Sequence, residues 1–105
     1  MLKNESEGVK KYMNLHTESL DKLFSAILKL ESVDECYRFF EDVCTIKELQ
    51  DISQRLEVAF LLNEGKNYQE ISSMTGVSTA TISRVNKCLN YGSGGYKAVI
   101  EKAEA

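Results

Sequence analysis

The segment from Thr79 to Asn90 combines short hydroxyl side chains with two cations and contains no acidic residue. Hydroxyl groups can hydrogen-bond to base edges, a methyl group can contact a thymine methyl, and cations pair with phosphate oxygens. This chemistry suits the major groove of DNA. The predicted DNA-binding side chains are Lys66, Gln69, Ser78, Thr79, Ala80, Thr81, Ser83, Arg84 and Lys87.

These side chains divide by the part of DNA they would contact. Base edges are assigned to Thr79, Ala80 and Ser83. Phosphates are assigned to Lys66, Gln69 and Lys87. Arg84 suits either a guanine or a phosphate, and both alternatives stay open. Simple solvent exposure is the alternative for Lys66 and Gln69.

Residues 68–87 have the spacing of a helix-turn-helix that would position this chemistry. Ile71 and Met74 are expected to face inward on a first short helix. Gly76 suits a left-handed turn position, and Ser78 suits the N-cap of the next helix. The second helix then has one apolar stripe, formed by Ile82, Val85 and Leu89. The alternative is an ordinary helical hairpin without a DNA function.

The rest of the chain predicts an all-α fold of about six short helices. The first expected helix covers residues 17–30 and has Leu28 on its apolar stripe. Two more helices begin at the capping patterns Ser32–Glu35 and Thr45–Glu48, and the second of them runs to a stop at Gly65. A last helix is expected at about 96–103, with Val99 and Ile100 inside. Residues 1–16 are expected to be irregular, with Met13 as a possible translation start. Residues 17–105 are expected to form a single all-helical DNA-binding domain, with the helix-turn-helix at about 68–90 and a C-terminal dimerisation helix at about 96–103.

Charge is distributed unevenly along the 105 residues, whose net charge is −3. Residues 17–62 carry five basic and ten acidic side chains, whereas residues 63–90 carry three basic and two acidic ones. Because non-specific affinity for DNA scales with the phosphates neutralised, the acidic body predicts weak non-specific binding. The global charge therefore weakens the DNA interpretation without excluding it.

Several function classes find no support in the sequence. No apolar stretch is long enough for a membrane span, and the N-terminus is too polar for a signal peptide. Cys36, Cys44 and Cys88 form no Cys-x-x-Cys pair, so we expect reduced thiols and a cytoplasmic protein. His16 is the only histidine, and no nucleophile lies beside a base. We therefore expect no metal, no cofactor, no membrane partner and no enzymatic activity.

Large apolar side chains are more numerous than short helices can bury by themselves. They include Phe24, Phe39, Phe40 and Phe60. Such a surplus predicts an interface and hence a homodimer, with an intramolecular core as the alternative. Two reading helices held about 34–36 Å apart would contact successive major grooves of an inverted repeat.

From about Val43 to Leu89 the chain resembles the Trp repressor family, and more narrowly its Trp-repressor-like YerC/YecD branch. The resemblance is carried by Thr45-Ile46-Lys47-Glu48, Ser53-Gln54-Arg55, Leu61-Leu62-Asn63-Glu64-Gly65 and Gly76-Val77-Ser78-Thr79-Ala80-Thr81-Ile82-Ser83-Arg84. It implies an intertwined homodimer whose shared core is built by the first three helices and the last one.

The resemblance also implies a candidate ligand pocket, made of Thr45, Arg55, Arg84, Val85 and Cys88. In that family two arginines, here Arg55 and Arg84, enclose the indole of bound tryptophan. This chain has Val85 where the family has a glycine that leaves room for the ring, and Cys88 where it has a serine. L-tryptophan is therefore not expected as corepressor, and another small molecule or no ligand remain alternatives. From the residues alone, Arg55 could instead pair with Glu48 or with a group in the neighbourhood of Glu57.

The sequence thus predicts a sequence-specific transcriptional regulator, most simply a repressor, that binds double-stranded DNA at an inverted-repeat operator as a homodimer. The alternative is a module with the same helix-turn-helix shape that docks a protein such as RNA polymerase. The low positive charge of the chain favours this alternative, whereas the uncharged, hydroxyl-rich surface of the second motif helix favours DNA binding.

Overall fold

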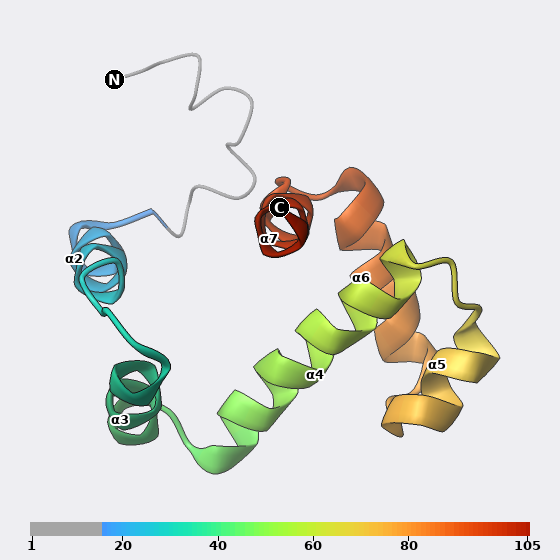
Figure 1. Cartoon of the computed structure of the whole chain (residues 1–105), viewed down its shortest axis with the longest axis horizontal. Helices are drawn as coiled ribbons and strands as arrows, with labels where there is room; N and C mark the ends of the chain where they lie inside the picture. The colour runs from blue at the N-terminus through green and yellow to red at the C-terminus, as the bar shows by residue number, and fades with distance from the viewer. Residues whose placement is uncertain (1–15) are drawn as a thin grey trace. The chain divides into compact units, whose positions relative to one another are not determined.

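The computed structural model describes residues 16–105, and these residues form helices joined by short turns without any strand (Figure 1). The helices are α2 (Glu18–Ile27), α3 (Val33–Val43), α4 (Ile46–Asn63), α5 (Tyr68–Thr75), α6 (Thr79–Tyr91) and α7 (Gly95–Glu104). The predicted all-α class with six helices is confirmed. The segment predicted to be irregular lies outside the described residues, apart from His16.

Capping side chains fix where the helices begin, because the first N–H groups of a helix have no partner within it. Thr45 Oγ1 accepts a hydrogen bond from Glu48 N at 3.1 Å, and Glu48 Oε1 accepts one from Thr45 N at 2.9 Å. This reciprocal pair confirms the predicted capping box of α4. Asn67 and Glu70 form the same arrangement at the start of α5.

The start of α3 differs in one detail from the predicted capping box. Ser32 Oγ accepts from Glu35 N at 3.0 Å, as expected. The Glu35 carboxylate, however, accepts from the N–H of Glu31 at 2.8 Å instead of the N–H of Ser32. The carboxylate therefore reaches one residue further back along the incoming chain.

The first helix is shorter than predicted. It ends at Ile27, since the N–H groups of Lys29 and Leu30 turn back to carbonyls only three residues away. Leu28, expected on the apolar stripe of this helix, lies beyond its end and is 84% exposed. A tight turn toward Ser32 thus replaces the last predicted helical turn.

Residues from Thr45 onward form one compact unit around the C-terminal half of α4. In it, α4 packs against α5, α6 and α7, and α6 packs against α5 and α7. Its buried core consists of Val58, Ala59, Leu61, Ile71, Val77, Ile82, Val85, Leu89 and Ile100. The predicted apolar stripe of α6 is confirmed.

Two side chains expected inside this unit are exposed. Met74 is 60% exposed, because the two-turn helix α5 has one covered side and Ile71 occupies it. Val99 is 48% exposed, because the inner side of α7 is formed by Tyr96 and Ile100, four residues apart. The predictions for Met74 and Val99 were therefore wrong within the chain.

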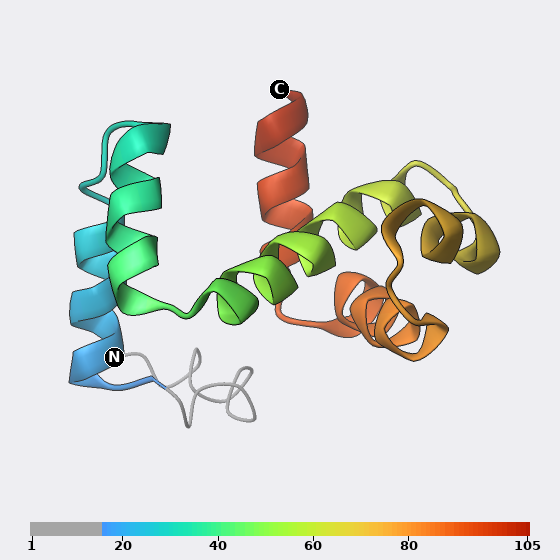
Figure 2. The ribbon, with the colours of Figure 1, turned by 90° about the horizontal axis from the view of Figure 1, so that it is seen from below.

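Among the described residues, 16–44 form a second compact unit, in which α2 and α3 run antiparallel side by side (Figure 2). The rings of Phe39 and Phe40 meet edge to face with centroids 5.2 Å apart. No side chain of α2 or α3 is fully buried. The chain thus divides after Cys44, and a single domain over residues 17–105 stays a prediction.

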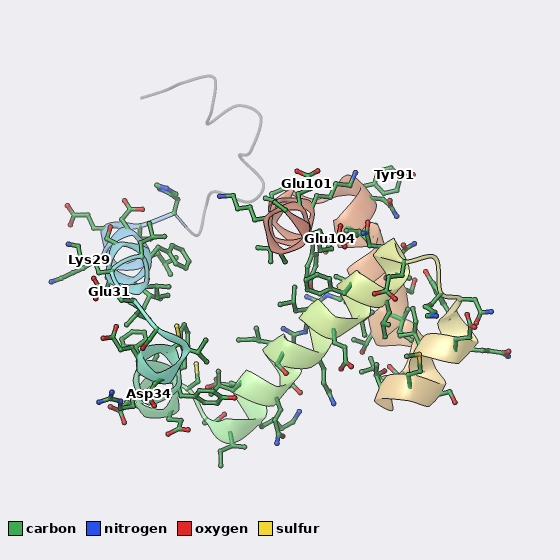
Figure 3. All side chains as sticks on the ribbon, viewed as in Figure 1. Lys29, Glu31, Asp34, Tyr91, Glu101 and Glu104 are labelled. Atoms are coloured by element: carbon green, nitrogen blue, oxygen red, sulfur yellow. The ribbon has the colours of Figure 1, made fainter. Side chains whose placement is uncertain are left out.

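The surface of this N-terminal unit has both charged and apolar parts. Lys29, Glu31 and Asp34 project from the turn and from the start of α3 (Figure 3). Exposed apolar side chains accompany them on the two helices and the turns: Phe24, Leu28, Val33, Tyr37 and Val43, each more than half exposed. Such a concentration of exposed apolar surface is typical of an interaction surface.

Candidate nucleic-acid interface and adjoining cavity

The turn between α5 and α6 is fixed by three residues. Gly76 has φ of 77°, a left-handed conformation that costs a residue with a Cβ about 1–2 kcal/mol. Thr75 Oγ1 donates to the carbonyl of Ile71 at 2.7 Å and accepts from the N–H of Val77 at 3.1 Å. Val77 is only 9% exposed and packs into the core. The turn is thus held by backbone, hydroxyl and apolar contacts together.

The start of α6 is capped by Ser78, as predicted. Its Oγ accepts from the N–H of Thr81 at 3.2 Å and donates to Thr81 Oγ1, also at 3.2 Å. Thr81 is partly buried, whereas Thr79 and Ala80 are exposed. The hydroxyls of Ser78 and Thr81 are therefore engaged with one another at the beginning of the helix.

The side chains assigned to DNA occupy accessible positions around this helix. Those classed as exposed are Gln69, Ser78, Thr79, Ala80, Ser83, Arg84 and Lys87, and Lys66 and Thr81 are partly exposed. The opposite side of α6 is buried through Ile82, Val85 and Leu89. Because this apolar stripe packs against α4 and α5, the small polar side chains and the cations of α6 face outward.

A cavity of about 470 Å³ adjoins the start of α6. Its walls come from α4, the turn, α6 and α7: Lys47, Asp51, Gln54, Arg55, Val77, Ser78, Thr81, Arg84, Val85, Cys88 and Tyr96. The structure therefore brings together four of the five predicted ligand-pocket residues, Arg55, Arg84, Val85 and Cys88. The fifth, Thr45, does not line the cavity, and its hydroxyl caps α4.

The charged side chains of the cavity wall are only partly paired. Lys47 Nζ lies 2.9 and 3.1 Å from the two carboxylate oxygens of Asp51, one helical turn away. The ion pairs among residues 16–105 do not include Arg55 or Arg84. The suggested pair of Arg55 with Glu48 is not formed, because the Glu48 carboxylate completes the cap of α4.

Tyr96 connects α7 to this group. Burial raises the pKa of its hydroxyl above the ordinary 10.0, and the nearby Cys88 thiol acts in the same direction. The guanidinium groups of Arg55 and Arg84 lower the pKa of Tyr96 by favouring its anion, without cancelling the rise. The four side chains therefore lie within electrostatic range of one another.

The C-terminal end of α6 depends on Gly92. A Cβ at this position would lie 2.4 Å from the carbonyl oxygen of Cys88, closer than real Cβ contacts. The carbonyl of Cys88 also accepts the N–H of Gly92 at 2.8 Å. Glycine thus permits the sharp end of α6 that precedes Tyr96.

Seven wall residues were not predicted for the pocket: Lys47, Asp51, Gln54 and Tyr96, together with Val77, Ser78 and Thr81 of the helix-turn-helix. The first two share a sequence signal with Arg55, because positions 47, 51 and 55 recur every four residues on one side of a helix. Tyr96 comes from a different helix, and no local spacing could have placed it beside α4.

No helix among residues 16–105 is long and apolar enough to cross a membrane. The same residues contain no cluster of three or more His, Cys, Asp or Glu side chains suited to a metal ion.

Known proteins are similar to this chain in sequence and in fold. The family model described as Trp repressor protein matches residues 18–104. The uncharacterized protein YerC of Bacillus subtilis (strain 168) is 52% identical over 90 residues, which cover 86% of each chain.

Two solved structures are also similar. A TrpR-like protein from Eubacterium eligens ATCC 27750 superposes with a TM-score of 0.84 at 54% identity, covering 87% of this chain and 94% of that one. A putative Trp repressor from Staphylococcus aureus gives a TM-score of 0.83 at 44% identity, covering 91% of this chain and 93% of that one. The family match covers most of the chain, and the fold, turn and helix order agree with it. The chain therefore belongs to the Trp repressor family.

Proposed function

We propose that this protein is a sequence-specific DNA-binding regulator, most simply a repressor, which binds an inverted-repeat operator as a homodimer. Membership of the Trp repressor family supports a helix-turn-helix regulator. The observation that carries the proposal is the accessible surface of α6, which offers hydroxyls, a methyl group and two cations without any acid. An α-helix of this kind fits the width of a major groove.

Each accessible side chain has a distinct role in the proposal. Thr79, Ala80 and Ser83 contact base edges, because they are small, exposed and near the start of α6. Lys87 and Arg84 contact phosphates on one side of the groove. Ser78 and Thr81 act mainly by capping and orienting the helix, since their hydroxyls are hydrogen-bonded to each other.

The remaining phosphate contacts involve the scaffold of the helix-turn-helix. Gln69 is exposed on the first turn of α5 and carries a side-chain amide donor. Lys66 is partly exposed in the connection before α5, where its backbone N–H bonds to the carbonyl of Leu61. Both residues would set the orientation of the protein on the duplex rather than its sequence preference.

A homodimer is supported by the exposed apolar surface of α2 and α3. Phe24 and Tyr37 are 55% and 63% exposed, and no residue of either helix is buried within the chain. A second copy would cover this surface and supply a second α6. Two equivalent helices then read two half-sites, so that the operator has the two-fold symmetry of the protein.

The proposal assigns no role to L-tryptophan. Val85 is 2% exposed and forms part of the cavity wall, where its branched side chain restricts the space for an indole. Isothermal titration calorimetry with L-tryptophan should give no saturable heat. Saturable binding that disappears in Arg84→Ala would show that tryptophan is the effector after all.

Charge reversal on α6 tests the DNA-binding surface. Lys87→Glu should abolish or strongly weaken the complex with DNA, because it replaces a phosphate contact with a repulsive charge. The loss of one such contact should also lower the salt slope by about 1 per protomer. Affinity is measured by fluorescence anisotropy on fragments selected by the unmodified protein, at two salt concentrations.

The matched control is Lys29→Glu, an equally large charge change at an exposed position of the turn after α2. This variant should retain most of the affinity. Equal losses in both variants would show that net charge alone governs binding. An unchanged complex in Lys87→Glu would contradict the DNA-binding role of α6 and favour a protein partner such as RNA polymerase.

A further inference from the structure

The cavity beside α6 offers a ligand more polar than apolar surface. Its aliphatic wall residues, Val77 and Val85, are 9% and 2% exposed and therefore belong mainly to the core. Pockets for apolar or aromatic ligands are lined predominantly by accessible hydrophobic side chains. The cavity wall is thus more polar than the wall of a typical site for a flat apolar ring.

The polar side chains of the wall suit a hydrophilic molecule. Gln54 supplies an amide, while Ser78, Thr81 and Tyr96 supply hydroxyl oxygens. These groups come from α4, from the beginning of α6 and from α7, so they surround the cavity from several elements. A volume of about 470 Å³ lies within the range of small-metabolite sites.

The charges of the wall favour an anion with two negative charges. Asp51 is already paired with Lys47, so its charge is largely compensated. Arg55 from α4 and Arg84 from α6 line the same cavity, and neither belongs to an ion pair among residues 16–105. Guanidinium groups bind carboxylate and phosphate oxygens through paired hydrogen bonds.

We propose that the cavity binds a small hydrophilic dianion, either a phosphomonoester or a dicarboxylate, whose charged groups are held by Arg55 and Arg84. The other polar wall residues hydrogen-bond to the rest of the ligand. The proposal deepens the proposed regulatory function, because it names the chemical class of an effector. Its regulatory part rests on that function, whereas binding itself does not.

The position of the cavity explains how such an effector influences DNA binding. Ser78 and Thr81 belong both to its wall and to the cap of α6. A ligand that bonds to these hydroxyls changes the capping contacts of the helix and therefore its orientation. Occupation of Arg84 also removes one cation from the surface available to phosphate.

Isothermal titration calorimetry of the full chain at physiological ionic strength tests the binding. The probes are ribose 5-phosphate, succinate, ribose and L-tryptophan. Because hydrogen bonds to charged groups contribute about 1.5–3 kcal/mol, at least one dianion should bind about tenfold more tightly than ribose and L-tryptophan. Equal binding of ribose, stronger binding of L-tryptophan, or no saturable binding of either dianion would overturn the proposal. The two dianions distinguish a phosphate ligand from a carboxylate ligand.

Three variants separate the cavity from surface charge in general. Arg55→Gln should lower dianion affinity about tenfold or more, because a charged hydrogen-bonding group is lost. The control Arg38→Gln, on α3 in an exposed pair with Asp34, should keep it. Asp51→Asn should raise the affinity several-fold, because Lys47 is freed and a negative charge is removed. Equal losses in Arg55→Gln and Arg38→Gln, or weaker binding in Asp51→Asn, would contradict the assignment.

The effect of the ligand on DNA affinity is measured separately, by fluorescence anisotropy with and without the dianion that binds more tightly. A change in DNA affinity of at least about threefold is expected, equivalent to a coupling above about 0.6 kcal/mol. An unchanged affinity would overturn the effector role. If the protein bound dianions but no DNA, both the proposed function and the effector role would be contradicted. The assignment of the cavity as a dianion-binding site would still hold.

Discussion

Ser78 Oγ and Thr81 Oγ1 lie 3.2 Å apart, so the residue that caps α6 is hydrogen-bonded to a residue of the cavity wall. The same Ser78 oxygen accepts the N–H of Thr81. A single pair of side chains therefore joins the beginning of the proposed DNA-reading helix to the proposed effector site. Side-chain changes at this pair affect helix stability, whereas changes further along α6 affect the accessible surface.

Ser78→Ala should destabilise the protein. The substitution removes the N-cap acceptor of α6, and such losses cost about 1 kcal/mol, within a range of roughly 0.5–2. The free energy of unfolding is measured by urea denaturation at a fixed protein concentration, since oligomer stability depends on concentration. An unchanged midpoint and slope would show that the cap contributes nothing.

Ser83→Ala should leave the stability of the protein nearly unchanged and weaken its preference for the selected DNA sequence. Ser83 is exposed in the middle of α6, so its removal should change the free energy of unfolding by less than about 0.5 kcal/mol. Loss of a base contact should nevertheless lower the preference for the selected DNA sequence, by about 1–3 kcal/mol if the contact is direct. Competition anisotropy with matched and mismatched duplexes measures this preference. Full specificity in the variant would contradict the assignment of Ser83 to a base edge.

Phe24→Asp should weaken the homodimer. Phe24 is 55% exposed on α2, and a charge there cannot be buried against a second copy without a large penalty. Sedimentation velocity over a concentration series should show a clear shift toward monomer. The adjacent Ser25→Asp places the same charge at another exposed position of α2 and serves as the control. Dimerisation that is equally strong in both variants would place the interface elsewhere.

Stability at high pH should depend on Tyr96. Because the pKa of Tyr96 is raised in the folded protein, the unfolded chain loses this proton first as the pH rises. Its contribution to stability is therefore complete below pH 10 and declines as the pH rises through the folded pKa. Tyr96→Phe has no titrating hydroxyl, so its melting temperature should fall less between about pH 9 and about pH 11. Parallel curves for both proteins would contradict a raised pKa.

Local signals in the sequence predicted most helix boundaries. The pair Thr45 and Glu48 identifies the start of α4, and Ser78 by itself identifies the start of α6. The side-chain oxygens of these residues accept hydrogen bonds from N–H groups only a few residues away. The core stripe of α6 follows from helical spacing in the same way. Contacts of this kind lie within one or two turns, where sequence order and spatial order agree.

The errors and omissions arise from neighbours that are distant in sequence. Met74 has suitable spacing for a core residue, but which side of a short helix is covered depends on α4 and α6. Tyr96 joins the cavity because α7 folds back after Gly92. The pocket residues Arg55 and Arg84 came from family resemblance, since each alone looks like an ordinary surface cation. Thr45 was included on the same basis and does not line the cavity within the chain.

Selection of fragmented genomic DNA from the host organism, followed by sequencing, tests the central claim most directly. Purified protein is incubated with the fragments at two salt concentrations, with Lys87→Glu as a parallel sample. The account predicts enrichment of a short inverted repeat, weaker enrichment at higher salt, and its loss in Lys87→Glu. Absence of any enriched sequence at low salt, with and without a dianion that binds the cavity, would contradict a sequence-specific DNA-binding role.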